Sequence, residues 1–212
     1  MLLEPPRSLR SLPTEGAQSA LGRPGGGLSP PSAWVQRFGS LIRPGGAVLD
    51  LACGSGRHVR CLLARGFTVT GVDRDATALA AVAAACPRAE LITADIEAGP
   101  WPLQGRHFEG IVVTNYLWRA LFAPLLSALA EGGVLIYETF ADGHQHIGRP
   151  TRPDFLLRHG ELLQVCAGLR VVAFEDGFEP ADEDHPARFV QRIAAVREGP
   201  AGALSARHGL AG

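Results

Sequence analysis

A glycine-rich turn is the first part of the sequence whose residue types could do chemistry. The run AVLDLACGSGRH, beginning at Ala47, carries Asp50 near the end of an apolar strand, then Gly54 and Gly56, then a helical pattern. Such a turn can hold the phosphates of a dinucleotide, whose fingerprint is G-x-G-x-x-G. Here Val59 occupies the third glycine position, and a carboxylate at Asp50 repels a pyrophosphate but attracts an ammonium group. The turn therefore favours a ligand with a positively charged group.

Two more carboxylates stand where predicted strands end. GVDRD places Asp73 at the end of the second strand, and TADIE places Asp95 and Ile96 at the end of the third. The carboxyl ends of parallel strands share one edge of a sheet, where ligands bind. An acid after the second strand can accept both hydroxyls of a ribose, and Asp95 with the amide of Ile96 suits an adenine. These residues predict a ligand that contains an adenosine.

A second group of side chains could act on another substrate. Asn115 and Tyr116 follow the fourth strand, and we expect them to face the reacting group. Glu138 lies in the apolar run VLIYETF, where an unpaired carboxylate is costly, so it either pairs with a cation or borders the pocket. His144 and His146 belong to a long polar loop that we expect over the site. Together with Glu138 they are the candidates for a general base.

Each of these residues also has a purely structural interpretation. Gly54 and Gly56 allow a tight turn, and Asp50 or Asp73 can cap a helix or close a turn. Loop histidines are commonly exposed to solvent, and a pair of them without a third ligand does not make a metal site, so we predict no metal. The agreement of all the strand-end residues in order favours a ligand site.

The elements that must position these residues follow an alternating pattern. Apolar strands separated by amphipathic helices predict a doubly wound, Rossmann-like α/β sheet with helices on both faces. Two further strands are separated only by a loop, so we expect an antiparallel pair at one edge. The predicted strands are 47–52, 68–73, 89–95, 108–116, 133–140, 169–179 and 188–197, and the predicted helices are 32–42, 56–66, 75–86, 117–133 and one that starts near Asp154.

Composition limits the classes of protein that remain. The 212 residues carry a formal net charge of −1, which argues against a protein that grips nucleic acid through phosphates, so nucleic acid is disfavoured as a partner. The four cysteines form no CxxC pair and are expected to be reduced and buried. No apolar run is long enough to cross a membrane, and the N-terminus does not read as a signal peptide, so we expect a cytoplasmic protein without membrane association. We expect one domain at 32–198 between flexible tails at 1–31 and 199–212.

Several quoted motifs together carry a family resemblance. VLDLACGSGRH, VTGVDRD, ITADIE and EGGVLIYETF resemble the ordered motifs of class I S-adenosylmethionine-dependent methyltransferases, over about residues 33–197. The resemblance implies a seven-stranded sheet with an antiparallel last strand, S-adenosylmethionine as cofactor and S-adenosylhomocysteine as product. The cofactor-binding residues that it implies are Asp50, Ala52, Gly54, Gly56, Arg57, Asp73, Arg74, Asp95, Ile96 and Asn115. Arg37 and Arg57 are alternative partners for the methionine carboxylate.

The acceptor of the methyl group is less defined. Asn-Tyr-Leu-Trp at 115–118 lacks the prolines of the (D/N)PP(Y/F) signature of relatives that methylate amino groups of bases. The loop after the fifth strand and the following GEL helix are similar to the small-molecule branch that includes tellurite-resistance methyltransferases. These features favour in-line methyl transfer to a small molecule with a soft or easily ionised nucleophile, by a monomer or homodimer.

Three other interpretations stay open at this point. An RNA or protein methyltransferase would be guided by the arginine-containing N-terminal tail. A non-catalytic S-adenosylmethionine-binding protein would bind the cofactor without turnover. A nicotinamide-dependent oxidoreductase is weakened by Val59 and Asp50.

Overall fold

The structure is a computed structural model that describes residues 29–183 and 185–199. Except for residues 29–31 and 199, the two predicted tails lie outside the described residues. In the part of the chain that is described, no helix is long and apolar enough to cross a membrane.

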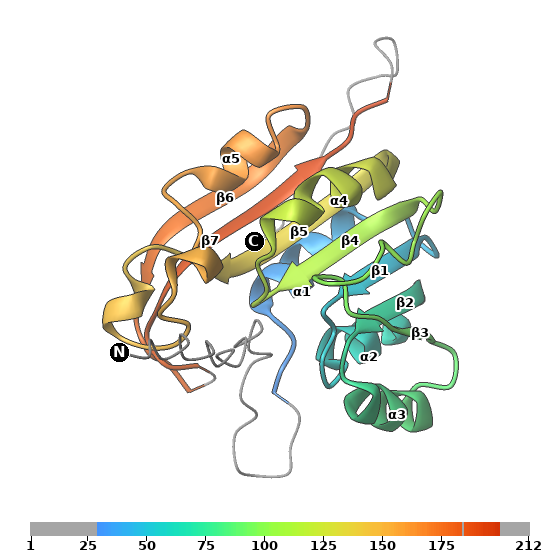
Figure 1. The fold of residues 1–212 in the computed structure, drawn as a ribbon. Coiled ribbons are helices and arrows are strands. Elements are labelled where there is room, and N and C mark those ends of the chain that lie inside the picture. The colour runs from blue at the N-terminus through green and yellow to red at the C-terminus, as the bar shows by residue number, and fades with distance from the viewer. Residues whose placement is uncertain (1–28, 184, 200–212) are drawn as a thin grey trace, which may run out of the picture.

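The described residues form a seven-stranded sheet in the order β3-β2-β1-β4-β5-β7-β6 (Figure 1). The first five strands are parallel, and β7 runs antiparallel to both β5 and β6. The prediction of a doubly wound sheet with an antiparallel pair at its edge is therefore confirmed. The strands are β1 Ala47–Leu51, β2 Thr68–Asp73, β3 Glu90–Thr93, β4 Phe108–Thr114, β5 Leu129–Phe140, β6 Arg170–Glu179 and β7 Arg188–Val196.

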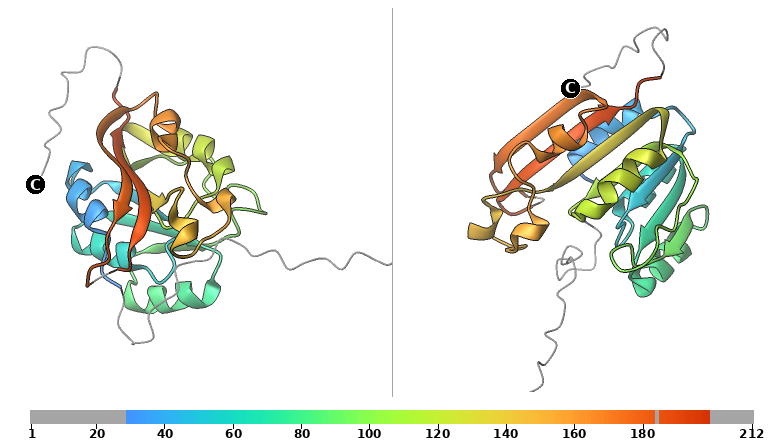
Figure 2. Two further views of the ribbon diagram at one scale, coloured as in Figure 1. Left: turned by 90° about the vertical axis from the view of Figure 1, so that its left-hand side faces the viewer. Right: turned by 45° about the horizontal axis from the view of Figure 1, so that its top comes forward.

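Helices cover both faces of the sheet (Figures 1 and 2). Apolar side chains of α1, α2 and α3 form one core layer, and those of α4 and α5 belong to the other. The central strands β1 and β4 lie between the two layers, which is why their sequences are nearly continuous apolar runs. The helices are α1 Ala33–Phe38, α2 Arg57–Ala64, α3 Ala76–Ala85, α4 Phe122–Ala128 and α5 Glu161–Val165, with 3₁₀ turns η1 Gly39–Leu41, η2 Arg119–Leu121, η3 His144–His146 and η4 Pro153–Phe155.

Two predicted helices are wrong in extent. The helix predicted over 117–133 ends at Ala128, because Leu129 already pairs with Phe108 of β4 and a bulge follows it in β5. Gly132, at φ 73° in this bulge, belongs to a strand rather than to a helix end. The helix predicted near Asp154 is only a 3₁₀ turn, and α5 begins at Glu161, after Gly160 adopts a left-handed conformation.

The parallel register fixes where the functional candidates lie. Asp50 of β1 stands beside Gly71 of β2 on one side and Val112 of β4 on the other. The strands β1, β2, β3 and β4 consequently end at the same edge. The loops that leave these ends, rather than any single motif, build the site.

Candidate functional site

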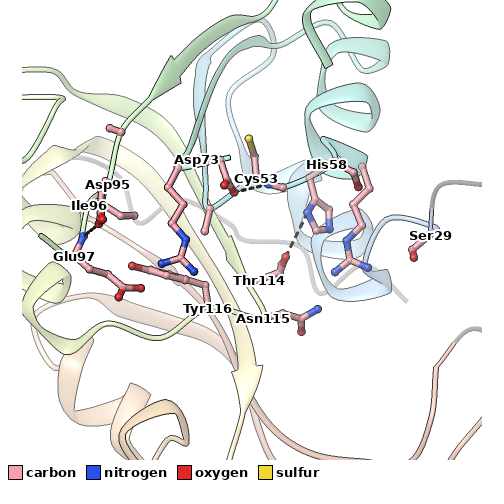
Figure 3. Close-up of a pocket in the computed structure, with 16 residues that line it drawn as sticks. Ser29, Cys53, His58, Asp73, Asp95, Ile96, Glu97, Thr114, Asn115 and Tyr116 are labelled. Carbon is pink, nitrogen blue, oxygen red and sulfur yellow. Dashed lines mark hydrogen bonds between the residues drawn. The ribbon is translucent and has the colours of Figure 1, made fainter. Parts of the chain in front are cut away.

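A cavity of about 890 Å³, part of it open to solvent, lies at the carboxyl ends of β1 to β4 (Figure 3). Its position outside the carboxyl ends of parallel strands is where open α/β sheets bind their ligands. Its walls come from Ser29 and from residues 52–55, 57–58, 73–74, 94–97 and 114–116. Among the residues that the structure describes, all those that line the cavity therefore precede position 117.

The glycine turn forms one wall through an unusual backbone. Ala52, Gly54 and Gly56 all have left-handed φ values, of 54°, 52° and 74°. Glycine accepts this conformation freely, whereas at Ala52 it costs about 1 kcal/mol or more. Gly56 precedes α2, and a Cβ added to it would lie 2.7 Å from Cγ2 of Val82 in α3. Gly54 thus shapes the cavity, while Gly56, which does not line it, lets α2 pack against α3.

The carboxylate of Asp73 is held between the glycine turn and the start of α3. Its Oδ2 accepts the N–H of Gly54 at 2.8 Å, and its Oδ1 accepts the N–H of Asp75 at 2.9 Å. Each oxygen keeps a second lone pair, so the fixed carboxylate can accept two neighbouring hydroxyl groups.

Asp95 marks the opposite end of the cavity, with Ile96 and Glu97 (Figure 3). Its Oδ1 accepts the N–H groups of Glu97 and Ala98, each at 3.0 Å, and these hydrogen bonds lower the pKa of the Asp95 carboxyl. The charged carboxylate thus fixes the turn that follows β3.

Asp50 lies behind the cavity wall rather than in it. Its side chain is 1% exposed, its Oδ1 lies 4.0 Å from Nδ1 of His58, and its Oδ2 has no hydrogen-bond partner among residues 29–183 and 185–199. Burial raises the pKa of the Asp50 carboxyl to about 7. A buried acceptor without a partner is unusual, and it suggests a ligand group that supplies one.

His58 is a cavity residue that the sequence did not single out. The N–H of Ser32 donates to Nε2 at 3.1 Å, so the proton lies on Nδ1, which faces Oγ1 of Thr114 at 3.4 Å. Burial and the neighbouring Arg57 lower the pKa of His58 to about 3, which leaves the imidazole neutral. The sequence signal that could have identified His58 is its position in the first turn of α2, directly after the glycine turn.

Asn115 directly follows β4 and has a strained backbone conformation. Its φ is 53°, its N–H donates to the carbonyl of Glu138 at 2.9 Å, and its Oδ1 is a second buried acceptor without a partner in the described chain. The next carbonyl, that of Tyr116, accepts the hydroxyl of Tyr137 at 2.8 Å. Strand β5 therefore holds this loop in place, and the local strain is typical of a functional site.

Arg57 and Arg74 supply the positive charges of the cavity. The guanidinium of Arg57 donates from Nη1 to the carbonyl of Pro30 at 3.2 Å, and burial lowers its pKa. Arg37, the other candidate for a carboxylate, lies over the ring of Phe38 and does not line the cavity. Arg57 is the better placed of the two for an anionic group of the ligand.

Glu138 is engaged in ion pairs away from the cavity. Ser32 Oγ donates to its Oε1 at 3.1 Å, Arg192 Nη1 lies 3.2 Å from its Oε2, and Arg188 Nη1 lies 3.8 Å from its Oε1. The side chain is 1% exposed. Of the two interpretations left open by the sequence, the geometry shows the pairing with cations.

The two loop histidines differ from each other. His144 is buried, with Nε2 donating to the carbonyl of Arg149 at 2.9 Å and Nδ1 accepting the N–H of Phe189 at 3.4 Å, so the expectation of solvent exposure is wrong for it. Its ring stacks on Phe140, and burial lowers its pKa. His146 is exposed. Neither lines the cavity with Asn115 and Tyr116, and no three metal-ligating side chains gather anywhere in the described ranges.

Arg119 joins the loop after β4 to the segment after β5. Its Nε and Nη2 donate to the two carboxylate oxygens of Glu161 at 2.7 and 2.9 Å. Its Nη1 and Nη2 also donate to the carbonyls of Asp154 and Leu156 at 2.7 and 2.8 Å. Because Ala141 and Leu157 form a bridge as well, residues 142–156 are fastened at both ends.

Comparison with known proteins agrees with this arrangement. Residues 48–133 match a family described as a methyltransferase domain. Trans-aconitate 2-methyltransferase of Rhizobium meliloti is 29% identical over 164 residues, which cover 71% of this chain and 57% of that protein.

Solved structures share the fold. TehB of Haemophilus influenzae has a TM-score of 0.63 at 20% identity, covering 78% of this chain and 61% of its own. The glycopeptide N-methyltransferase MtfA, solved with S-adenosylmethionine bound, has a TM-score of 0.54 at 20% identity, covering 76% of this chain and 92% of its own. The chain thus spans less than two thirds of the R. meliloti protein and of TehB. Strand order, glycine turn and sequence match thus agree that this chain is similar to the class I S-adenosylmethionine-dependent methyltransferases, whose cofactor is S-adenosylmethionine.

Proposed function

We propose that this protein transfers a methyl group from S-adenosylmethionine to a small-molecule acceptor. The observation that carries the proposal is the cavity, where groups suited to each part of the cofactor meet at four strand ends. A mere structural turn would not leave two buried acceptors, Asp50 Oδ2 and Asn115 Oδ1, without partners in the described chain beside it.

The residues present fit the cofactor. Asp73, whose carboxylate is held by two backbone N–H groups, would accept the two ribose hydroxyls, and Asp95 with Ile96 would contact the adenine. Arg57 offers a guanidinium to the methionine carboxylate, and the two unpartnered acceptors suit the ammonium group. A dinucleotide would instead bring a pyrophosphate toward Asp50 and Asp73, which is electrostatically unfavourable.

The bound cofactor supplies an activated methyl group on a sulfonium, and the chain's own residues supply position. The loop from Asn115 to Tyr116, held by Glu138 and Tyr137 of β5, forms the wall where an acceptor would approach. Holding two reactants aligned is the main contribution such an enzyme makes to in-line transfer. Because Glu138 and His144 are engaged elsewhere, the geometry supports an acceptor that ionises readily without a strong protein base.

A small acceptor is supported by two observations. The R. meliloti relative is named for a small carboxylate. The net charge of −1 argues against binding driven by nucleic-acid phosphates.

Calorimetry tests the cofactor part of the proposal. Purified protein is titrated with S-adenosylmethionine, S-adenosylhomocysteine and, as control, NADH. We expect micromolar binding of the first two and none of NADH. Absence of binding by both adenosyl compounds would refute the proposal.

Transfer is then tested with S-adenosylmethionine labelled in its methyl group. The acceptors are a panel of thiols, phenols and carboxylates that includes trans-aconitate, with bulk RNA and unfractionated protein as comparison. We expect label in small molecules. Label found only in RNA or protein would refute the small-molecule acceptor, and cofactor binding without any turnover would identify a non-catalytic binding protein.

A further inference from the structure

Asp50 is the buried titratable group that the proposed function does not fully explain. A carboxylate that only had to attract an ammonium group would work best if it were permanently charged and hydrogen-bonded. Asp50 is instead 1% exposed, and its Oδ2 lacks a partner within the described part of the chain. An ionised carboxylate in such a place pays a large desolvation penalty.

The groups around Asp50 do not compensate for this penalty. His58 of α2 is its nearest basic neighbour at 4.0 Å, but the Ser32 N–H on Nε2 keeps that ring neutral. Arg57 and the backbone N–H of Val59, both in α2, favour the charged carboxylate, whereas Asp73 at the end of β2 opposes it, and burial outweighs them all.

The other titratable groups nearby do not stabilise a charged Asp50 either. Cys53 lies in the glycine turn, and burial raises the pKa of its thiol. The side chain of Glu138 in β5 accepts a hydrogen bond from Ser32, interacts electrostatically with Arg57, and pairs with Arg188 and Arg192. Desolvation is therefore the dominant influence on Asp50, and it favours the neutral acid.

We propose that Asp50 is a neutral carboxylic acid before the cofactor binds, and that it gives up its proton to solvent when the cofactor's ammonium group enters the cavity. The inference rests on the proposed function, because it concerns that same cofactor. Ala52 lies two residues after Asp50, and Nδ1 of His58 lies 4.0 Å from Asp50 Oδ1. Both residues line the cavity, so an ammonium group at this wall lies close to the carboxyl. A positive charge within about 4–6 Å lowers a carboxyl pKa by about 1–3 units.

This loss of a proton from Asp50 makes binding of the amino-acid part of the cofactor depend on pH. Below the pKa of about 7 the free protein must release a proton on binding, so affinity increases as pH rises and levels off above that pKa. A nucleoside without the amino-acid part has no ammonium group and escapes this dependence. Asp50 thereby selects ligands by their ammonium group, which neither Asp73 nor Asp95 contacts in the proposed arrangement.

The test is calorimetric titration of the full-length protein with two probes between pH 5.5 and 7.5. S-adenosylhomocysteine carries the ammonium group, and 5′-deoxy-5′-methylthioadenosine lacks the amino-acid part. We expect the dissociation constant of S-adenosylhomocysteine to fall about 20-fold over this range, and that of methylthioadenosine to stay within about twofold. Buffers of different ionisation enthalpy should report release of about 0.75 proton at pH 6.5 and about 0.25 at pH 7.5.

Two variants sharpen the result. Asp50→Asn keeps the shape but cannot titrate, so S-adenosylhomocysteine binding should lose its pH dependence. His107→Gln removes an exposed histidine outside the cavity, and the proton count should be unchanged.

The wild-type comparison of the two probes needs no variant to fold. Binding of S-adenosylhomocysteine that varies less than twofold, or equal proton release by both probes, would overturn the inference while leaving the cofactor assignment intact. No binding of S-adenosylhomocysteine at any pH would instead remove the proposed function and the inference with it.

Discussion

Replacement of Gly56 by alanine is expected to destabilise the protein for two reasons, backbone strain and a steric clash with Val82. Gly56 has φ 74°, a conformation that costs an L-residue about 1–2 kcal/mol. Its added Cβ would also lie 2.7 and 2.8 Å from the two methyl carbons of Val82, which is 0% exposed. Overpacking of this kind costs about 1–3 kcal/mol. The expected loss in the free energy of unfolding is therefore about 2–5 kcal/mol.

Gly45→Ala is the matched control. Gly45 has φ 71°, but its added Cβ would meet nothing within 4 Å, so only the conformational cost applies. Urea unfolding followed by circular dichroism measures both variants. The difference between them, about 1–3 kcal/mol, isolates the contact between α2 and α3.

A double variant checks the named contact. Val82→Ala removes the two methyl carbons, so Gly56→Ala should cost less in that background than in the wild type. If Gly56→Ala were no more destabilising than Gly45→Ala, the role of Gly56 in helix packing would be wrong.

Three further changes have expected outcomes. Asp73→Ala should weaken S-adenosylhomocysteine binding at least about 100-fold by calorimetry, because two charge-assisted hydrogen bonds are lost; unchanged affinity would contradict the proposed ribose site. Between about pH 4 and 6.5, His58 makes the free energy of unfolding rise with pH, because its folded pKa is lowered, and Asp50 makes it fall, because its folded pKa is raised. Each group changes the free energy of unfolding by about 1.4 kcal/mol per pH unit, so the two contributions should cancel in the wild type. Urea unfolding of Asp50→Asn should show a free energy that rises with pH, and that of His58→Gln one that falls. Arg119→Met should speed hydrogen exchange at 153–161 at least about tenfold, because it removes four hydrogen bonds, with S-adenosylhomocysteine affinity within twofold; equal exchange would show that the segment is held by other contacts.

The fold was predictable because its strands carry a strong local signal. β1 and β4 are apolar runs that begin and end at turn residues, and Asp73 and Asp95 follow directly from where such runs end. Their roles toward the cofactor remain predictions, although the structure brings both into one cavity.

What the sequence could not predict depends on partners far along the chain. The tautomer of His58 is set by a hydrogen bond from the N–H of Ser32, 26 residues away. Glu138 contacts Arg192 because the antiparallel register of β5 and β7 pairs these two residues. His144 is buried because the distant Phe189 packs and bonds against its loop. The end of α4 at Ala128 likewise follows from pairing with Phe108, which no helical propensity reveals. Local pattern specifies elements, whereas these side chains are placed by tertiary contacts.

Among the described residues, every one that lines the cavity precedes position 117, so the cavity wall is separate in sequence from residues 142–156. Residues 142–156 leave the sheet after that point and are held at their base by the Ala141–Leu157 bridge and by Arg119. An insertion or exchange within this segment, with its two fastenings kept, alters the surface offered to a second molecule without touching a residue that lines the cavity. Related proteins could therefore differ in their acceptors through changes in residues 142–156 alone, while the residues that line the cofactor cavity stay the same.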